Sequence, residues 1–153
     1  MDNKLMIVPV KQTFQLDVMY NLYYEPAERA IDNIKYLALH KEGLTKYIGK
    51  VKDTCIVTIK NGNILFEKNI DEDFKKNIID MIDLISYKDK QEDNYLKSYP
   101  NIFYNIERYV PMENNNNNYL LRASKFKNLS ELLEKNDEDK SIEEIANLLN
   151  GKI

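Results

Sequence analysis

Residues 34–68 read IKYLALHKEGLTKYIGKVKDTCIVTIKNGNILFEK, and this stretch decides the fold class. It contains four apolar-rich runs, at Ile34–Leu39, Tyr47–Val51, Cys55–Ile59 and Ile64–Phe66. Turn-forming residues separate these runs at Glu42-Gly43, Lys52-Asp53 and Asn61-Gly62-Asn63. Short apolar runs divided by such turns are typical of antiparallel strands. The stretch therefore predicts an antiparallel meander.

The same reasoning extends outward to both ends of the chain. Strands are expected in residues 1–70 and 101–127, and helices at about 12–22, 71–86, 129–135 and 141–149. Capping-box spacing marks the starts of the last two helices, at Asn128 with Glu131 and at Ser141 with Glu144. These elements predict an α+β fold.

Three segments between these elements are predicted to be irregular. Residues 20–26 carry three tyrosines and predict an aromatic loop, and the polar residues 87–100 predict a long loop or a frayed helix end. Five asparagines, Asn114–Asn118, form a low-complexity tract between the strand-like runs Ile102–Val110 and Tyr119–Lys127. We expect these two runs to form a hairpin with a mobile tip.

Length and composition favour one domain. The chain has 153 residues, of which 43% are hydrophobic, enough for one sizeable core. The amino end, MDNKLMIVPV, lacks the long apolar region of a signal peptide, and no run approaches the roughly 18 apolar residues of a membrane span. A cytoplasmic location without membrane contact is expected. The single cysteine, Cys55, excludes an intrachain disulfide and is predicted to be a buried thiol.

Charge is unevenly distributed along the chain. The formal net charge of -3 argues against binding nucleic acid by bulk charge alone. Seven lysines face three acids between Lys35 and Lys68, and four bases face one acid between Arg108 and Lys127. Acids instead outnumber bases in the expected helices. Basic strands and acidic helices predict two electrically different faces.

The sequence carries no pattern typical of an enzyme. The only histidine, His40, is expected to be a surface or turn residue, and it has no partner for a zinc site. Asp53 followed by Glu67-Lys68 loosely resembles the acid, then acid-x-lysine pattern of metal-dependent nucleases, but the intervening residue is missing. We therefore expect no catalytic activity, no metal and no cofactor.

Aromatic residues are mostly tyrosines: the chain has eleven Tyr, five Phe and no Trp. Several of them flank the two basic segments. Aromatic rings beside Lys and Arg are what a protein uses to stack a base and to hold its phosphate, above all for single-stranded or extruded nucleotides. Tyrosine is also a good strand former, so many of these rings are expected in the core or at its rim.

Several short segments together resemble the PUA-like domain superfamily, in particular the ASCH- and EVE-related domains of bacterial restriction and defence proteins. The matching segments are Met6–Lys11, Tyr23-Tyr24, Ile34–Leu39, Tyr47–Val51 and Arg122–Leu133. The resemblance implies a single PUA-like domain over residues 1–153, a small, partly open antiparallel β-barrel with peripheral helices. Such domains receive a flipped or modified base in an aromatic-lined pocket.

The resemblance also implies which residues bind the base. Tyr23 and Tyr24 correspond to the place where the group often has a tryptophan. The remaining residues expected to line or approach the pocket are Tyr36, Lys46, Tyr47 and Arg122.

Two functions follow as expectations. The first is a non-catalytic module that reads a flipped, modified or single-stranded base, in bacterial or phage defence. The second is a protein that inhibits a nucleic-acid enzyme, of the anti-restriction or anti-CRISPR type, with the acidic helices of Glu131–Glu144 mimicking phosphates. The partner is therefore nucleic acid or a protein that processes it.

Overall fold

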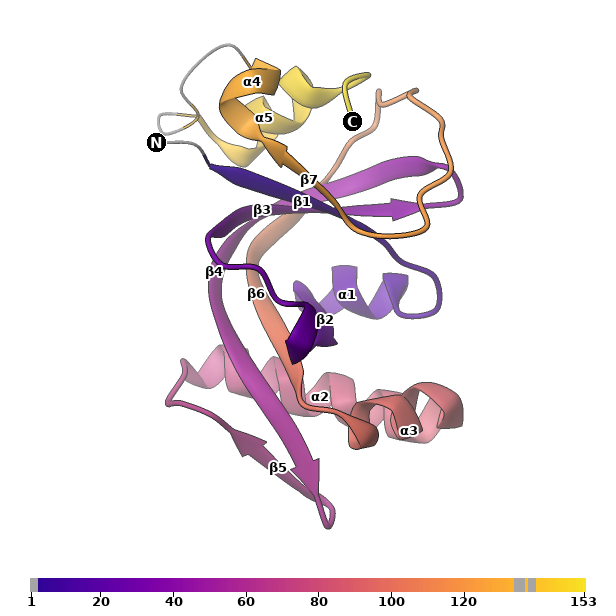
Figure 1. Ribbon diagram of the computed structural model, residues 1–153, viewed down its shortest axis with the longest axis vertical. Coiled ribbons are helices and arrows are strands. Elements are labelled where there is room, and N and C mark those ends of the chain that lie inside the picture. The colour runs from indigo at the N-terminus through magenta and orange to yellow at the C-terminus, as the bar shows by residue number, and fades with distance from the viewer. Residues whose placement is uncertain (1–2, 134–136, 138–139) are drawn as a thin grey trace. The chain divides into compact units, whose positions relative to one another are not determined.

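The computed structural model describes residues 3–133, 137 and 140–153. In chain order its elements are β1 (Lys4–Pro9), α1 (Phe14–Tyr20), β2 (Leu22–Pro26), the 3-10 helix η1 (Ala27–Arg29), β3 (Ile34–Lys41), β4 (Leu44–Lys60), β5 (Asn63–Phe66), α2 (Glu72–Lys88), α3 (Lys90–Ser98), β6 (Asn101–Pro111), β7 (Lys125–Asn128), α4 (Leu129–Leu133) and α5 (Ile142–Leu149), as Figure 1 shows. The predicted α+β class is confirmed.

The chain divides into two compact units. Unit 1 comprises Met1–Gln15, Asp32–Val51 and Ile106–Ile153, and unit 2 comprises Leu16–Ile31 and Lys52–Asn105. The long strands β4 and β6 contribute residues to both. Each unit has its own buried apolar cluster.

In unit 1 the strands follow the order β6-β4-β3-β1-β7. The central pair, β1 and β3, is parallel, with Leu5 opposite Tyr36 and Ile7 opposite Ala38. β4 pairs antiparallel with β3, and β7 pairs antiparallel with β1 (Figure 1). The sheet is mixed, so the prediction of a purely antiparallel sheet was wrong. A parallel pair needs a long connection, which residues 10–33 provide between β1 and β3.

One face of the unit 1 sheet is covered by α4 and α5. Leu5 and Ile7 point to this face because side chains alternate along a strand. They pack with apolar residues of the two helices, Leu129, Leu133, Ile145, Ala146 and Leu149. The predicted capping box is present at the start of α5, where the Ser141 side chain accepts a hydrogen bond from the Glu144 amide.

In unit 2 the core is built from β2, β4, β5, α2, α3 and β6. β2 pairs antiparallel with β6, and β5 pairs antiparallel with β4. The largest apolar contribution comes from α2, whose buried side chains are Phe74, Ile78, Met81, Ile82 and Ile85. Cys55 is buried in the same cluster, as predicted.

Two of the three expected turns are correct. Positive φ angles occur at Glu42, Gly43, Asn61 and Gly62, the positions of the β3–β4 and β4–β5 turns. The turn expected at Lys52-Asp53 was wrong, because β4 continues through these residues. Neither residue is glycine or has a positive φ, so the backbone stays extended there.

Two of the predicted loops are regular elements. Residues 22–26 form β2 rather than a loop. Within residues 87–100, α3 forms because the Asp89 side chain accepts a hydrogen bond from the Glu92 amide and caps it, and because Leu96 is buried. Helix prediction failed here because only one strongly apolar residue of α3 packs in the core.

The expected hairpin of residues 102–127 was also wrong. The first expected strand, Ile102–Val110, is present within β6. Of the expected returning strand, Tyr119–Lys127, only the end is regular, as part of β7 (Lys125–Asn128), and β7 pairs with β1 instead of β6. The asparagine tract redirects the chain. The buried Asn115 amide donates to the Thr45 and Ile153 carbonyl oxygens, at 2.9 and 3.0 Å, and its oxygen accepts from the Gly151 amide at 2.8 Å. Asn115 is therefore an anchor, where a mobile loop tip was expected.

Candidate nucleic-acid interface

Two of the six residues expected to bind a base, Tyr23 and Tyr24, belong to unit 2. The Tyr24 hydroxyl donates a 2.5 Å hydrogen bond to Glu92, and its ring stacks on Phe103 with centroids 5.1 Å apart. Burial, followed by this hydrogen bond, raises the Tyr24 pKa far above its usual range. Only 7% of Tyr24 is exposed. Its position is explained by the core of unit 2.

Tyr23 is half-buried beside a second buried tyrosine. Its ring centroid lies 5.9 Å from that of Tyr104, whose hydroxyl donates to Glu25 at 3.2 Å. Burial and the Glu25 carboxylate raise the Tyr23 pKa. Burial also raises the pKa of Glu25, and the hydrogen bond from Tyr104 opposes that rise. These three residues form a polar cluster inside unit 2.

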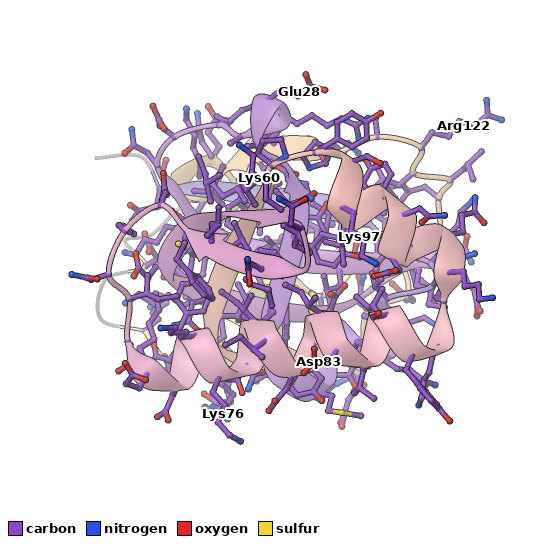
Figure 2. All side chains as sticks on the ribbon, turned by 90° about the horizontal axis from the view of Figure 1, so that it is seen from below. Glu28, Lys60, Lys76, Asp83, Lys97 and Arg122 are labelled. Atoms are coloured by element: carbon purple, nitrogen blue, oxygen red, sulfur yellow. The ribbon has the colours of Figure 1, made fainter. Side chains whose placement is uncertain are left out.

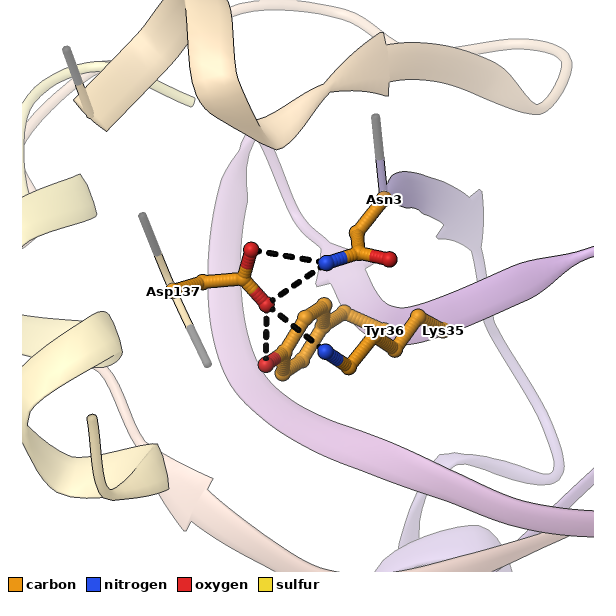
Figure 3. A network of polar contacts seen from close by, with 4 residues as sticks. All are labelled: Asn3, Lys35, Tyr36 and Asp137. Atoms are coloured by element: carbon orange, nitrogen blue, oxygen red, sulfur yellow. Dashed lines mark hydrogen bonds and ion pairs between the residues drawn. The ribbon is translucent and has the colours of Figure 1, made fainter. Parts of the chain in front are cut away.

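The other four residues, Tyr36, Lys46, Tyr47 and Arg122, belong to unit 1. Tyr36 is buried in β3, and its hydroxyl donates a 2.8 Å hydrogen bond to the carboxylate of Asp137. Figure 3 shows that the same carboxylate accepts from the Asn3 amide, at 2.8 and 3.0 Å, and from the Lys35 ammonium at 3.0 Å. Asp137 thus joins the beginning of β1, β3 and the segment before α5.

The Asp137 carboxylate is held in its charged form by these donors. Burial raises its pKa, but the hydrogen bonds from Asn3, Lys35 and Tyr36, together with the ammonium charge, lower it to about 2. Hydrogen bonds to the charged form commonly lower the pKa of a buried carboxyl group in this way. This network was not predictable from local patterns, because Asp137 lies 101 residues after Tyr36 in the chain.

Lys46, Tyr47 and Arg122 lie at the surface of unit 1. Lys46 pairs with Glu42 at 3.6 Å, and the Tyr47 ring packs on Phe14 with centroids 5.7 Å apart. Arg122 is exposed and projects into solvent (Figure 2). Phe14 in turn lies under the ammonium of Lys41, which is 4.8 Å from the ring centroid.

Lys41 also lines a cavity of about 390 Å³ in unit 1, which we call the His40 groove. Its walls are Pro9, Val10, Lys11, Gln12, His40, Lys41, Glu42, Gly43, Leu120 and Leu121. The volume lies within the range of small-ligand sites, and a mostly apolar wall with a few polar groups is typical of them. Arg122 directly follows the last of these residues in the sequence.

His40 holds one wall of the His40 groove in place. It is buried, so the expectation of a surface or turn residue was wrong. Its Nε2 lies 2.9 Å from the Tyr119 carbonyl oxygen, which can only accept, so Nε2 carries the hydrogen. In the neutral imidazole Nδ1 then accepts from the Thr45 hydroxyl at 2.9 Å. Through its two ring nitrogens His40 links Thr45 of β4 to Tyr119.

The segment that carries Leu120 and Leu121 is also held at Tyr119. The Tyr119 amide donates to the Gly43 carbonyl oxygen at 2.8 Å, and its ring lies 4.5 Å from that of His40. The ammonium of Lys125 lies 4.6 Å from the centroid of the Tyr119 ring. Two pairs of an aromatic ring and a lysine, Phe14 with Lys41 and Tyr119 with Lys125, therefore belong to the surroundings of this groove.

Sequence reasoning missed most of this site. Tyr47 and Arg122 were selected, but the lysines and aromatic rings next to the groove, Phe14, Lys41, Tyr119 and Lys125, were not. Their positions in the sequence are far apart, and they come together only through tertiary contacts such as the anchoring of Tyr119 on His40. The mixture of basic and aromatic residues in residues 108–127 was the one available signal.

The nuclease-like residues of unit 2 are engaged with their own chain. Lys68 pairs with Asp53 at 2.9 Å, and Glu67 accepts a hydrogen bond from the Ile56 amide at 2.9 Å. The hydrogen bond to Asp53 raises the pKa of Lys68. Within residues 3–133, 137 and 140–153, no group of three His, Cys, Asp or Glu side chains is placed to hold a metal ion.

Two further findings concern the chain as a whole. No helix in the described part of the chain is both long enough and apolar enough to cross a membrane. Comparison of the chain with protein-family models, with curated proteins and with solved structures finds no match. The PUA-like assignment therefore stays a prediction.

Proposed function

We propose that the protein is a non-catalytic nucleic-acid-binding module that receives a flipped, modified or single-stranded base in the His40 groove. The observation that carries the proposal is the combination of a largely apolar cavity of about 390 Å³ with lysines and aromatic rings around it. The PUA-like resemblance agrees with this reading, and it stays part of the proposal.

Different residues of the groove suit the two parts of a nucleotide, the base and the phosphate. Val10, Leu120 and Leu121 offer apolar contacts to the flat face of a base, which loses stacking partners when it leaves a strand. Lys11 and Lys41 line the same groove and offer positive charge to phosphates. The one acid in the wall, Glu42, has its carboxylate 3.6 Å from the ammonium of Lys46, which reduces repulsion of a polyanion.

The phosphate-mimic alternative has less support from the contacts. The expected acidic surface is Glu131–Glu144, and all four of its described carboxylates interact within the chain, Glu131 by accepting from the Asn128 side-chain amide at 3.5 Å. Asp137 is buried in its network, Glu143 pairs with Arg108, and Glu144 completes the capping box. These contacts reduce the negative charge that this segment can offer to a partner.

Oligonucleotide binding tests the proposal. We expect single-stranded oligonucleotides to bind, and affinity to fall steeply between about 50 and 200 mM salt because binding releases counterions from phosphates. Lys41→Gln should weaken binding about threefold to tenfold and lower the slope of log affinity against log salt by about 0.7, the value for one phosphate contact on a single strand. Fluorescence anisotropy with single- and double-stranded probes, with and without modified bases, measures both quantities.

Two further variants sharpen this test. Leu120 is 74% exposed, so Leu120→Ser should leave the fold intact. It should weaken oligonucleotide binding by the same factor at every salt concentration, because it removes an apolar contact and no charge. Lys60→Gln, an exposed lysine of unit 2 that Figure 2 shows, serves as the charge-matched control and should bind as the unchanged protein does. Absence of binding at low salt, or equal losses in Lys41→Gln and Lys60→Gln, would contradict the proposal.

A further inference from the structure

A second cavity of unit 1, of about 230 Å³, has a different chemical character from the His40 groove. Three cationic side chains line it: Lys50 of β4, Arg108 of β6 and Lys140, which precedes α5. They come from three separate segments of the chain, so no local sequence pattern accounts for their convergence. We call this cavity the Arg108 cavity.

The convergence of three positive charges is unfavourable unless anions lie nearby. Two carboxylates line the same cavity, those of Glu107 and Glu143. Glu143 forms an ion pair with the Arg108 guanidinium. The hydrogen bond that the Arg108 guanidinium donates in this pair lowers the pKa of Glu143. One charge-assisted contact is therefore made within the chain, and with Glu107 set against Lys50 and Lys140 the wall keeps one net positive charge.

The contact between Glu143 and Arg108 shows the kind of group that this cavity accepts. A guanidinium presents its donors in a planar fork that fits carboxylate and phosphate oxygens alike. Glu143 is half exposed, with 50% of its side chain accessible, so water can solvate its carboxylate once it leaves the guanidinium. A stronger anion can therefore take its place.

We propose that the Arg108 cavity binds the phosphate group of a small molecule, which displaces the Glu143 carboxylate from Arg108 and is also contacted by Lys50 and Lys140. The volume lies below the roughly 300 Å³ at which sites for drug-sized ligands begin, so the occupant has few atoms besides the phosphate. The ring of Tyr36, held by Asp137, forms part of the wall. This inference does not depend on base binding in the His40 groove.

Calorimetric titration with inorganic pyrophosphate tests the proposal. Glu143→Gln should bind pyrophosphate about fivefold more tightly than the unchanged protein, because it removes a competing charge of the same sign. Arg108→Gln should bind about tenfold or more weakly, because a charge-assisted contact is lost. Both side chains are at least half exposed, so circular dichroism should show an unchanged fold.

One further variant and one control complete the test. Lys140→Gln should weaken pyrophosphate binding, and the control Lys60→Gln in unit 2 should leave it unchanged. Equal affinity in Arg108→Gln and the unchanged protein, or no gain in Glu143→Gln, overturns the proposal. A single-stranded oligonucleotide distinguishes the source of the phosphate: if Arg108→Gln weakens its binding while pyrophosphate does not bind, the cavity holds a backbone phosphate and the small-molecule proposal fails. Lys41→Gln tests the His40 groove separately, since it should leave pyrophosphate binding unchanged.

Discussion

Asp137→Asn is expected to lower the free energy of unfolding by about 2–3 kcal/mol at neutral pH. The carboxylate is 5% exposed and accepts hydrogen bonds from Asn3, Lys35 and Tyr36. An asparagine in its place carries no charge and turns an amide donor toward other donors. The loss is large because Lys35 and Tyr36 then keep buried or half-buried polar groups without their acceptor.

The same carboxylate makes stability dependent on pH. Its pKa is about 2 in the folded protein against an ordinary value of 3.8, so the unfolded chain binds the proton more readily. The stabilisation is therefore fully present above about pH 4 and is lost as the pH falls through 2. The difference corresponds to about 2.5 kcal/mol between these limits. Asp137→Asn should lack this part of the acid sensitivity.

Urea unfolding followed by circular dichroism, at about pH 6 and about pH 2.5, measures both effects. Tyr36→Phe, which removes one of the donors, should cost only about 1 kcal/mol at the higher pH. Asp83→Asn, on the exposed face of α2 in Figure 2, is the matched control and should change neither value. Equal stability of Asp137→Asn and Asp83→Asn would show that the network contributes nothing.

Gly49→Ala is expected to destabilise the protein by about 2–3 kcal/mol, although the same change in an ordinary strand stabilises by roughly 0.5–1 kcal/mol. The backbone of Gly49 lies in β4 against β6. A Cβ at this position would collide with the Ile106 side chain and would lie 2.9 Å from the Arg108 carbonyl oxygen. The backbone oxygen cannot move without disturbing the sheet, so overpacking outweighs the gain in propensity.

A double-mutant cycle with Ile106→Ala identifies the cause. Ile106 is 2% exposed, so Ile106→Ala alone is destabilising. If the collision is responsible, the double variant should lose less stability than the sum of the two single variants, because the side chain that Cβ meets is gone. Thermal or urea unfolding gives the three values. Strict additivity, or a stabilising Gly49→Ala, would refute the steric explanation.

Local signals in the sequence predicted α2 and α5 well, whereas they missed α3. α2 and α5 lie close to the expected ranges of 71–86 and 141–149, and the Ser141–Glu144 capping box is present. These features depend on residues within a few positions of one another, so a single sequence contains the relevant information. The turns at Gly43 and Gly62 were predictable for the same reason, since only a few residue types adopt positive φ readily.

The partners of the strands could not be predicted in the same way. An apolar run indicates a strand, but the edge that it joins depends on the rest of the fold, as β7 and its pairing with β1 illustrate. Polar anchors show the same limit. Asn115 belongs to a run of five similar residues, and only its contacts with Thr45, Gly151 and Ile153 distinguish it from its neighbours.

The sequence by itself determined the α+β class, the positions of most helices and the buried state of Cys55, because each follows from local spacing and from apolar content. The tertiary structure alone decided the parallel pairing of β1 with β3, the burial of His40, the His40 groove and the Arg108 cavity. Each of these depends on contacts between residues far apart in the chain. Their energies arise only when the backbone has already brought the partners together.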